Sequence, residues 1–477
     1  MLTRLEVDGF KNLIDFSIDF GPYTCIAGPN GVGKSNIFDA IRFLSLLADR
    51  PLEEAALLVR GGDLEIGDVE DLFWTNGEDQ APQFKIAAEM LIEPNVFDDF
   101  GRPTEANSSY LRYEIEIGFE KPANRVFIGR LILLSEKLDY ITEGKASKRL
   151  KFPHSPTEFR KSVVINKRRT QSGYISVQES TDGFTEILVH QDGGSRGPAQ
   201  TSPASSAPRT IVATSNTSVT PTILAARREM QQWRFLALEP SAMRSPDRFQ
   251  TSPSITINGG HVPATLARLV QQTENSGGDA EDVYSDVAMR VARLVPILDI
   301  EVEIDDARQL LTLKVREENG IKLPAASLSD GTLRFMTLAV LASDSSIKGL
   351  VCIEEPENGI HPAKVRQMVE LLQNLAVNPM HKPDDENPFR QIIIATHSPA
   401  FVQLQNPDDV LFATEALVSK NDQKRIRTLR CRPLANTWRD RKESGPSVGY
   451  ATIQAYLTTP PGAQIRMFDD YLEPSIR

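Results

Sequence analysis

Eight consecutive residues near the beginning of the chain have the types and spacing of a phosphate-binding loop. They read Gly-Pro-Asn-Gly-Val-Gly-Lys-Ser and occupy residues 28–35. Glycines let the backbone wrap closely around phosphate oxygens and turn several N–H groups toward them. A lysine at Lys34 supplies a charge for the β- and γ-phosphates, and the hydroxyl of Ser35 supplies a ligand for Mg²⁺. The pattern predicts a site for ATP with Mg²⁺.

The segments on either side of this loop have the patterns that the loop requires. Residues 23–27 form an apolar strand pattern, and residues 36–47 form a helical one. The positive end of that helix would add to the field felt by a phosphate. The alternative is a glycine turn that only resembles the motif, and the strand and helix argue against it.

Two further chemical groups follow buried-strand patterns late in the chain. Residues 349–353 are apolar and lead into Glu354 and Glu355, while residues 391–395 lead toward His397. The carboxyl ends of such strands are where α/β sheets bind ligands. One carboxylate can reach Mg²⁺ while its neighbour orients a water, and the imidazole can contact the γ-phosphate. The alternatives are an acidic helix cap for the pair and a structural role for the histidine.

Two weaker candidates lie in the second half of the chain, before His397. Ser329 and Gly331 come at the start of an apolar helical pattern. Such a helix start can bind an anion, but a serine there is also a common helix cap. His361 precedes Pro362, where it is either a residue that starts a helix or a catalytic one.

Composition limits the class of protein. The 477 residues are 40% hydrophobic and 25% charged, as in soluble globular proteins, and the length favours two or three lobes. No apolar run approaches the ~18 residues of a membrane span, and the first residues form a strand pattern in place of a signal peptide. Three distant cysteines suit a reducing cytoplasm and exclude a zinc site of cysteine pairs. We expect a cytoplasmic protein without a membrane contact.

The order of patterns suggests an α/β fold with four segments. Residues 1–75 hold the phosphate loop, residues 76–220 are rich in period-two strands, residues 221–320 are helical with connecting strands, and residues 321–477 hold the acids and His397. Residues 191–220 are rich in Gly, Ser, Pro and Thr, which predicts a flexible loop there. A helix is expected over residues 283–298.

A basic run lies within the strand-rich segment. Residues 145–170 carry nine bases and one acid, although the whole chain has a net charge of −11. The bases are Lys145, Lys148, Arg149, Lys151, Arg160, Lys161, Lys167, Arg168 and Arg169. One interpretation is the solvated surface of a β-hairpin, and the other is a contact with nucleic acid or a partner.

Taken together, these motifs resemble those of ABC-type ATPases of the RecF/SMC/OLD branch. Residues 28–35 match Walker A, residues 328–332 match the signature motif, and residues 350–355 match Walker B. Asp330 replaces the usual first glycine of the signature, and Glu354 stands where many relatives have Asp. The form Glu-Pro-Glu-x-x-x-His-Pro is similar to that of the OLD-like group. Residues 75–320 match only loosely, as a variable insertion.

The resemblance implies an ABC-type ATPase head fold and assigns roles to individual residues. Two heads would enclose ATP between Walker A of one copy and the signature of the other, giving a homodimer or a larger homo-oligomer. Glu354 would serve Mg²⁺, Glu355 would be the general base and His397 the switch histidine. Ser329 and Gly331 would contact γ-phosphate in trans. The loop and its surroundings would bind nucleotide through Asn30, Gly31, Gly33, Lys34, Ser35, Asn36 and Lys11, with Gln80 and Gln83 as candidates for a glutamine lid.

The resemblance also frames the biological hypotheses. The segment after His397 is shorter than a typical domain of ~100–150 residues, so we expect no nuclease domain of the Toprim kind. Relatives of this architecture act beside a separately encoded effector protein, such as a nuclease, in defence against phage or plasmids. One alternative is a DNA-repair clamp that grips DNA through residues 145–170. A transporter ATPase fits less well, because the insertion is long and the Glu-Pro-Glu form differs.

Overall fold

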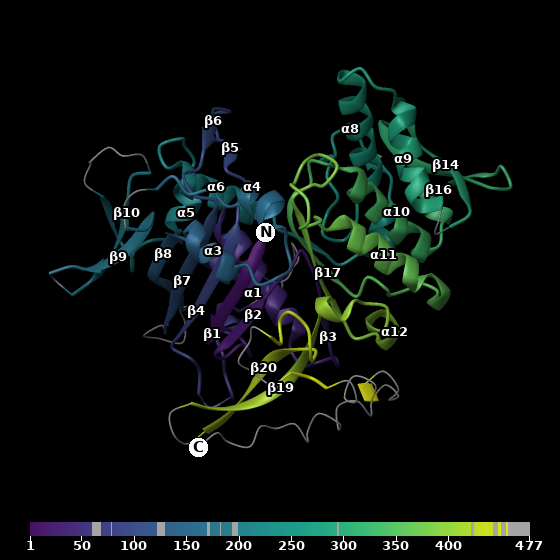
Figure 1. Cartoon of the computed structure of the whole chain (residues 1–477). Coiled ribbons are helices and arrows are strands. Elements are labelled where there is room, and N and C mark those ends of the chain that lie inside the picture. Colours follow the sequence, from purple (N-terminus) through teal and green to yellow (C-terminus); the bar gives the residue numbers. More distant parts are fainter. Residues whose placement is uncertain are drawn as a thin grey trace. The chain divides into compact units, whose positions relative to one another are not determined.

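The computed structural model describes the parts of the chain that follow. These are residues 1–59, 68–77, 79–121, 129–168, 172–181, 183–192, 199–292, 295–420, 424–441, 447–449 and 455–456. The chain divides into two compact units. Unit 1 contains Met1–Trp233, Asn378–Asn387 and Pro407–Arg477, and unit 2 contains Arg234–Val377 and Pro388–Asn406 (Figure 1).

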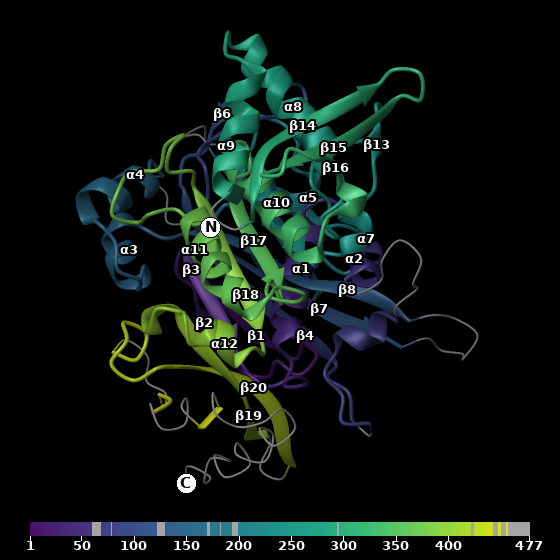
Figure 2. The same cartoon turned by 90° about the vertical axis from the view of Figure 1, so that its right-hand side faces the viewer.

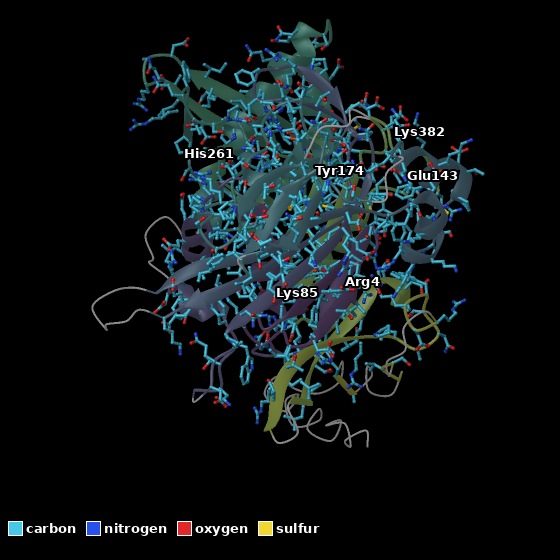
Figure 3. The ribbon with its side chains drawn as sticks, turned by 90° about the vertical axis from the view of Figure 1, so that its left-hand side faces the viewer. Arg4, Lys85, Glu143, Tyr174, His261 and Lys382 are labelled. Carbon is cyan, nitrogen blue, oxygen red and sulfur yellow. The ribbon has the colours of Figure 1, made fainter. Side chains whose placement is uncertain are left out.

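An antiparallel sheet of eight strands dominates unit 1, in the order β11-β10-β9-β8-β7-β4-β1-β2. Its strands are β1 (Leu2–Asp8), β2 (Phe16–Asp19), β4 (Gln83–Leu91), β7 (Tyr110–Glu120), β8 (Arg130–Tyr140), β9 (Ile175–Glu179), β10 (Thr185–Val189) and β11 (Gln200–Pro203). Figure 3 labels Arg4 and Lys85 on the neighbouring strands β1 and β4. Because Leu5 on β1 pairs with Ala88 on β4, the boundary we expected between residues 75 and 76 does not separate two sheets.

An aromatic cluster fixes the helix that follows the phosphate loop against this sheet. Phe43 on α1 (Lys34–Leu47) and Phe84 on β4 meet edge to face, with ring centroids 5.7 Å apart. Phe10 and Phe73 contact Phe84 at 5.2 and 4.9 Å. All four rings are buried, so each contributes apolar area and ring contacts to the position of α1.

Three more strands of unit 1 lie beneath the phosphate loop. The buried strand β3 (Tyr23–Ala27) pairs in parallel with β19 (Val410–Lys420), which pairs in antiparallel with β20 (Lys424–Pro433). The remaining elements of unit 1 are α2 (Leu52–Leu58), η1 (Val69–Leu72), β5 (Asn95–Phe97), β6 (Pro103–Glu105), α3 (Glu143–Arg149), η2 (Pro156–Arg160), α4 (Lys161–Val163), α5 (Ile211–Thr214), α6 (Pro221–Gln231) and η5 (Pro407–Asp409).

Unit 2 contains three parallel strands in the order β12 (Arg234–Leu236), β17 (Gly349–Glu354) and β18 (Arg390–Thr396). Every residue of β17 and β18 is buried except Glu354, as continuous apolar runs predict for parallel strands. Its other elements are α7 (Pro240–Met243), β13 (Asp247–Arg248), α8 (Val262–Asn275), α9 (Ala280–Ala292), β14 (Ile297–Asp305), β15 (Leu310–Glu317), β16 (Lys322–Pro324), η3 (Ala325–Ser327), α10 (Asp330–Ser343), η4 (Pro362–Lys364), α11 (Val365–Leu375) and α12 (Pro399–Val402). Helices α8 and α9 lie side by side (Figure 1, Figure 2).

Three expectations about local structure were wrong. Helix α9 ends at Ala292 and β14 begins at Ile297, because Pro296 cannot continue a helix. The described part of residues 191–220 holds β11 and α5 in place of a loop without structure. The described part of the basic run holds α3, η2 and α4 in place of a hairpin. Arg169 lies outside the described residues.

No helix in the described part of the chain is long and apolar enough to span a membrane.

Candidate nucleotide site

Close backbone contacts shape the phosphate loop between β3 and α1. A Cβ at Gly28 would come within 2.6 Å of the carbonyl oxygen of Ala413 on β19. A Cβ at Gly33 would come within 2.2 Å of the Asn12 amide, and the φ of Gly33 is 100°. Both positions therefore require glycine, because any larger residue would collide or be strained. Gly28 and Gly33 are therefore explained by the residues around the loop as well as by its expected ligand.

Lys34 lies folded over the loop that precedes it. Its Nζ donates hydrogen bonds to the carbonyl oxygens of Gly28 (2.7 Å) and Pro29 (2.8 Å), and the side chain is buried. Asn30, Gly31 and Ser35 are exposed on the same loop. The lysine charge is thus held by groups that a phosphate oxygen could replace, beside the exposed backbone of the loop.

The amino-terminal end of α1 is arranged to receive an anion. Gly33 is the N-cap residue, and no side chain forms a cap hydrogen bond there. The first turn carries no acidic residue, so no carboxylate competes for its N–H groups. The N–H groups of a helix's first turn and the helix dipole favour negative charge at this end. The donors present therefore fit the phosphates of a nucleotide.

Side chains from the connection between β1 and β2 brace the loop. Asn12 donates through Nδ2 to the carbonyl oxygen of Val32 (2.9 Å), and Asn36 donates to Asn12 Oδ1 (2.7 Å). Lys11 forms an ion pair with Asp39 on α1 at 2.7 Å between Nζ and Oδ2. Asn36 and Lys11, both predicted to bind nucleotide, thus also support the loop. Asn12, the neighbour of Lys11 in the sequence, thus links the loop to α1.

In unit 2, the structure brings Glu355 and His397 together. Glu354 is the last residue of β17, and the next residue, Glu355, has a φ of 46°, which is uncommon for a residue with a side chain. Its N–H donates to the carbonyl oxygen of Ala395 on β18 (2.9 Å), which holds this conformation. Glu355 Oε2 lies 2.7 Å from His397 Nδ1, although the alignment is not that of a hydrogen bond. An acid and an imidazole predicted separately are therefore neighbours.

A third acid, Glu357, joins this pair and was missed from the sequence. Its carboxyl is buried and accepts a hydrogen bond from the Thr396 hydroxyl, and the Glu355 carboxyl lies near enough to affect its charge. Burial raises the pKa of Glu357 to about 7, and the charge of Glu355 acts in the same direction. Glu357 therefore holds a proton for part of the time near neutral pH. The sequence feature that could have identified Glu357 is its place as the second glutamate of Glu-Pro-Glu.

The signature residues begin helix α10 in unit 2. Ser329 is the N-cap residue and accepts a hydrogen bond from the Thr332 N–H (3.2 Å), as the capping interpretation predicts. Asp330, which departs from the usual glycine, forms an ion pair with Arg244. Arg244 also donates to the carbonyl oxygen of Leu328 (3.1 Å), so one guanidinium fixes both sides of Ser329. A Cβ at Gly331 would meet the Gly359 carbonyl oxygen at 3.5 Å.

The weaker candidates have structural partners. His361 is the N-cap residue of η4 and accepts a hydrogen bond from the Ala363 N–H (3.2 Å). Gln83 lies on β4 and donates to Glu116, while Gln80 forms an isolated bridge with Thr75. The glutamine lid stays a prediction.

Much of the basic run is neutralised within unit 1. Arg149 pairs with Glu89, Lys151 with Asp19 (2.6 Å) and Lys167 with Glu105 (2.5 Å). Arg168 lies over the ring of Tyr174, which Figure 3 labels, at 4.0 Å from the ring centroid. Lys145, Lys148 and Lys161 are exposed. The charge available to a polyanion is therefore smaller than the sequence count suggests.

Two protein families match separate parts of the chain. Residues 229–403 match the family described as "AAA domain, putative AbiEii toxin, Type IV TA system", and residues 4–188 match a family described as "AAA domain". The first match contains Glu354, Glu355 and His397, and the second contains residues 28–35. The matches therefore cover the motifs that carry the expected chemistry.

Individual relatives match over short segments. The chain is 46% identical to the chromosome partition protein Smc of Bacillus subtilis over 106 residues, which are 22% of this chain and 8% of that protein. It is 51% identical to an OLD nuclease of Thermus scotoductus over 41 residues, 9% of this chain and 8% of that protein. A solved Smc head bound to the C-winged helix domain of ScpA is similar with a TM-score of 0.45 and 13% identity, over 91% of this chain and 98% of that one. The chain thus matches less than a tenth of the length of these curated relatives.

Proposed function

The chain carries AAA-family ATPase domains and has SMC and OLD proteins among its relatives, and from this premise we propose that it is a nucleotide-driven dimerisation switch. The family implies that it hydrolyses ATP. In the proposed cycle, ATP closes two copies of the chain and hydrolysis reopens them. The observation that carries this proposal is the Glu355–His397–Glu357 cluster after the ends of two parallel strands.

The phosphate loop would bind the nucleotide. Lys34 would exchange the carbonyls of Gly28 and Pro29 for phosphate oxygens, and the N–H groups at the start of α1 would donate to them. Ser35 and Glu354 would hold Mg²⁺, which neutralises phosphate charge when bound. Among the described residues, no group of three His, Cys, Asp or Glu could hold a metal ion. Phosphate oxygens and water would complete the shell of Mg²⁺.

The acids of unit 2 would catalyse hydrolysis. Glu355 would accept the proton of the attacking water, and His397 would contact the γ-phosphate or orient that water. Glu357 supports this role by keeping a proton, because two neighbouring ionised carboxylates would repel each other. Ser329 and Gly331 would face the γ-phosphate held by a second copy of the chain.

The cellular role that we propose is that of the ATPase component of a defence system against phage or plasmids, acting with a separately encoded effector such as a nuclease. The support is the Glu-Pro-Glu-x-x-x-His-Pro form, the OLD relative and the toxin–antitoxin wording of one family description. A pull-down with the products of neighbouring genes tests for the effector, and recovery of no partner would count against this role.

The decisive experiment replaces the proposed base. Glu355→Gln should still bind ATP but lose at least ~100-fold in hydrolysis and accumulate as an ATP-bound dimer. ATP turnover by phosphate release and molecular mass by light scattering measure the two effects. Turnover equal to that of the unaltered chain would remove Glu355 as the base.

A second candidate function is an ATP-dependent DNA clamp, which the SMC relatives favour. In that case the exposed bases Lys145, Lys148 and Lys161 would contact DNA, and changing all three to Gln should weaken binding and reduce its salt dependence. The matched control changes the exposed Arg248, Arg308 and Lys382 to Gln. Equal DNA affinity and salt slope in both triple variants would leave the basic run as a solvated surface.

A further inference from the structure

Arg334 is a largely buried cation whose Nε has no hydrogen-bond acceptor among the described residues. It lies on α10, is 8% exposed, and no described residue accepts a hydrogen bond from its Nε. No acid of the described part forms an ion pair with it, although Asp330 and Glu357 act on its charge from a greater distance. A buried N–H of a charged group without an acceptor is costly to maintain. The Nε of Arg334 can therefore donate to a ligand that binds beside it.

The position of Arg334 places this charge at the beginning of α10. Side chains on a helix lean toward its amino terminus, so Arg334 covers the turn that contains Asp330 and Gly331. Asp330 and Glu357, the two acids that act on it, agree with this direction. Ser329 caps the same turn. The side chain of Arg334 therefore lies at the end of α10 that carries the signature residues.

A second arginine reaches the same place from another element. Arg244, which follows α7, donates to the Leu328 carbonyl oxygen (3.1 Å) and to Asp330, and it is 32% exposed. Two guanidinium groups thus act on one aspartate at the positive end of a helix of 14 residues. A guanidinium has five N–H donors, so Arg244 can keep Asp330 and still donate to a phosphate oxygen.

We propose that Arg244 and Arg334 bind the terminal phosphate of a nucleoside triphosphate that a second copy of the chain presents to the signature loop. This inference rests on the proposed function, in which Ser329 and Gly331 face that nucleotide in trans. Asp330 forms an ion pair with Arg244 until the nucleotide binds. Arginine suits this task because its planar fork donates two parallel hydrogen bonds to a phosphate.

The simpler explanation is that each arginine only balances a nearby acid. Arg244 would then matter only while Asp330 is present, and Asp330→Gly would make Arg244 dispensable. Under the phosphate role, Arg244 remains necessary after Asp330 is gone. The double variant Arg244→Gln with Asp330→Gly therefore separates the two explanations.

The experiment measures dimerisation by light scattering against MgATP concentration, with Glu355→Gln in every chain so that ATP is not consumed. Arg244→Gln and Arg334→Gln should each raise the MgATP concentration for half-dimerisation about tenfold or more, the loss expected of a charge-assisted hydrogen bond. Adding Asp330→Gly should not restore Arg244→Gln. Affinity of the dilute monomer for a fluorescent ATP analogue should stay unchanged, because the phosphate loop is intact. Arg308→Gln, an exposed arginine of the same unit, is the control.

Folding of the Arg334 variants is checked by thermal unfolding. Arg334→Lys keeps the charge and most of the packing, and it should also raise the MgATP midpoint because the fork is lost. Recovery of Arg244→Gln by Asp330→Gly, or an unchanged midpoint in folded Arg334→Lys and Arg334→Gln, would overturn this inference alone. A Glu355→Gln parent that binds ATP but stays monomeric would overturn the proposed switch and this inference with it.

Discussion

The phosphate loop and the acidic cluster are built in opposite ways. The hydrogen bonds of the loop join residues close in the sequence, since Lys34 bonds to carbonyls five and six residues away and Asn12 to Val32 from 20 residues away. A distant strand enters only as the wall that Ala413 forms against Gly28. The cluster depends on separate elements, since Glu357 bonds to Thr396 across 39 residues and Arg244 reaches Asp330 across 86. The geometry of the phosphate loop therefore depends mainly on a local motif, whereas that of the acidic cluster depends on packing between helices and strands.

This difference separates the effects that substitutions should have. Changes in the loop act on nucleotide affinity, because the loop holds the phosphates. Changes around Glu355 act on turnover at nearly constant affinity, because the acids act on the water.

The largest effect is expected from Lys34→Ala, which removes the charge aimed at the phosphates. Affinity for MgATP should fall at least ~100-fold, corresponding to about 3 kcal/mol, and hydrolysis should become undetectable. Titration with a fluorescent ATP analogue measures the loss. Lys11→Ala is the matched lysine control and should cost far less, because Lys11 is already paired with Asp39. Equal losses in both variants would mean that Lys34 has no special place in the site.

Gly33→Ala tests whether the loop depends on its walls. The new Cβ would collide with the Asn12 amide at a φ of 100°, which should destabilise the loop by about 1–3 kcal/mol and lower nucleotide affinity about tenfold or more. Gly31→Ala is the control, because its φ is also positive but nothing lies within 4 Å of the added Cβ. The difference between the affinities of the two variants for nucleotide measures the effect of the collision with Asn12. An equal loss of affinity in both variants would show that the collision has no effect.

On the other side of the comparison, Glu357→Ala should lower turnover about tenfold with little change in ATP affinity. It removes the neighbour that keeps Glu355 in place, and Thr396 loses its acceptor. Glu357→Gln should retain most of the rate at pH 7, because an amide can replace a protonated carboxyl as a donor to Glu355. Phosphate release at saturating ATP measures both rates. A Gln variant as slow as the Ala variant would show that the ionised form of Glu357 is needed.

The smallest effect on nucleotide chemistry is expected at Glu136, a buried acid of unit 1 that also has a pKa of about 7 because of burial. It accepts hydrogen bonds from the Ile211 and Val212 N–H groups at 2.6 and 3.0 Å. The folded state binds the proton more tightly than the unfolded chain, whose value is near 4.5. The contribution of Glu136 to stability is therefore greatest below pH ~4.5 and falls by up to ~3 kcal/mol as pH rises to ~7. Urea unfolding against pH should show this slope, and Glu136→Gln should flatten it without changing ATP turnover.

The local half of the site was the more predictable one. The strand, loop and helix around residues 28–35 could be predicted because eight adjacent residues specify them, and so could the strands that precede Glu355 and His397. The family resemblance is confirmed by both family matches. The ion pair of Asp330 with Arg244 could not be predicted, because no local pattern joins residues 86 apart.

Two errors of secondary structure have identifiable causes. In the basic run, the charges concealed buried residues at helical spacing, Ala146 with Leu150 and Phe159 with Val163. Over residues 283–298, the helical pattern outweighed Pro296, whose missing N–H ends a helix. The four segments drawn from the sequence also separated β1 from β4, which are hydrogen-bonded partners, because register between distant strands leaves no mark in either strand alone.

The contact of Gly28 with Ala413 has a consequence for synthesis on the ribosome. Strand β3 pairs with β19, where Cys25 faces Val410, so the floor of the phosphate loop is translated long after the loop itself. A nascent chain that ends before residue 410 carries the whole Walker A sequence but lacks the strand against which Gly28 packs. The growing chain should therefore acquire its affinity for ATP late, only after most of its length has left the ribosome.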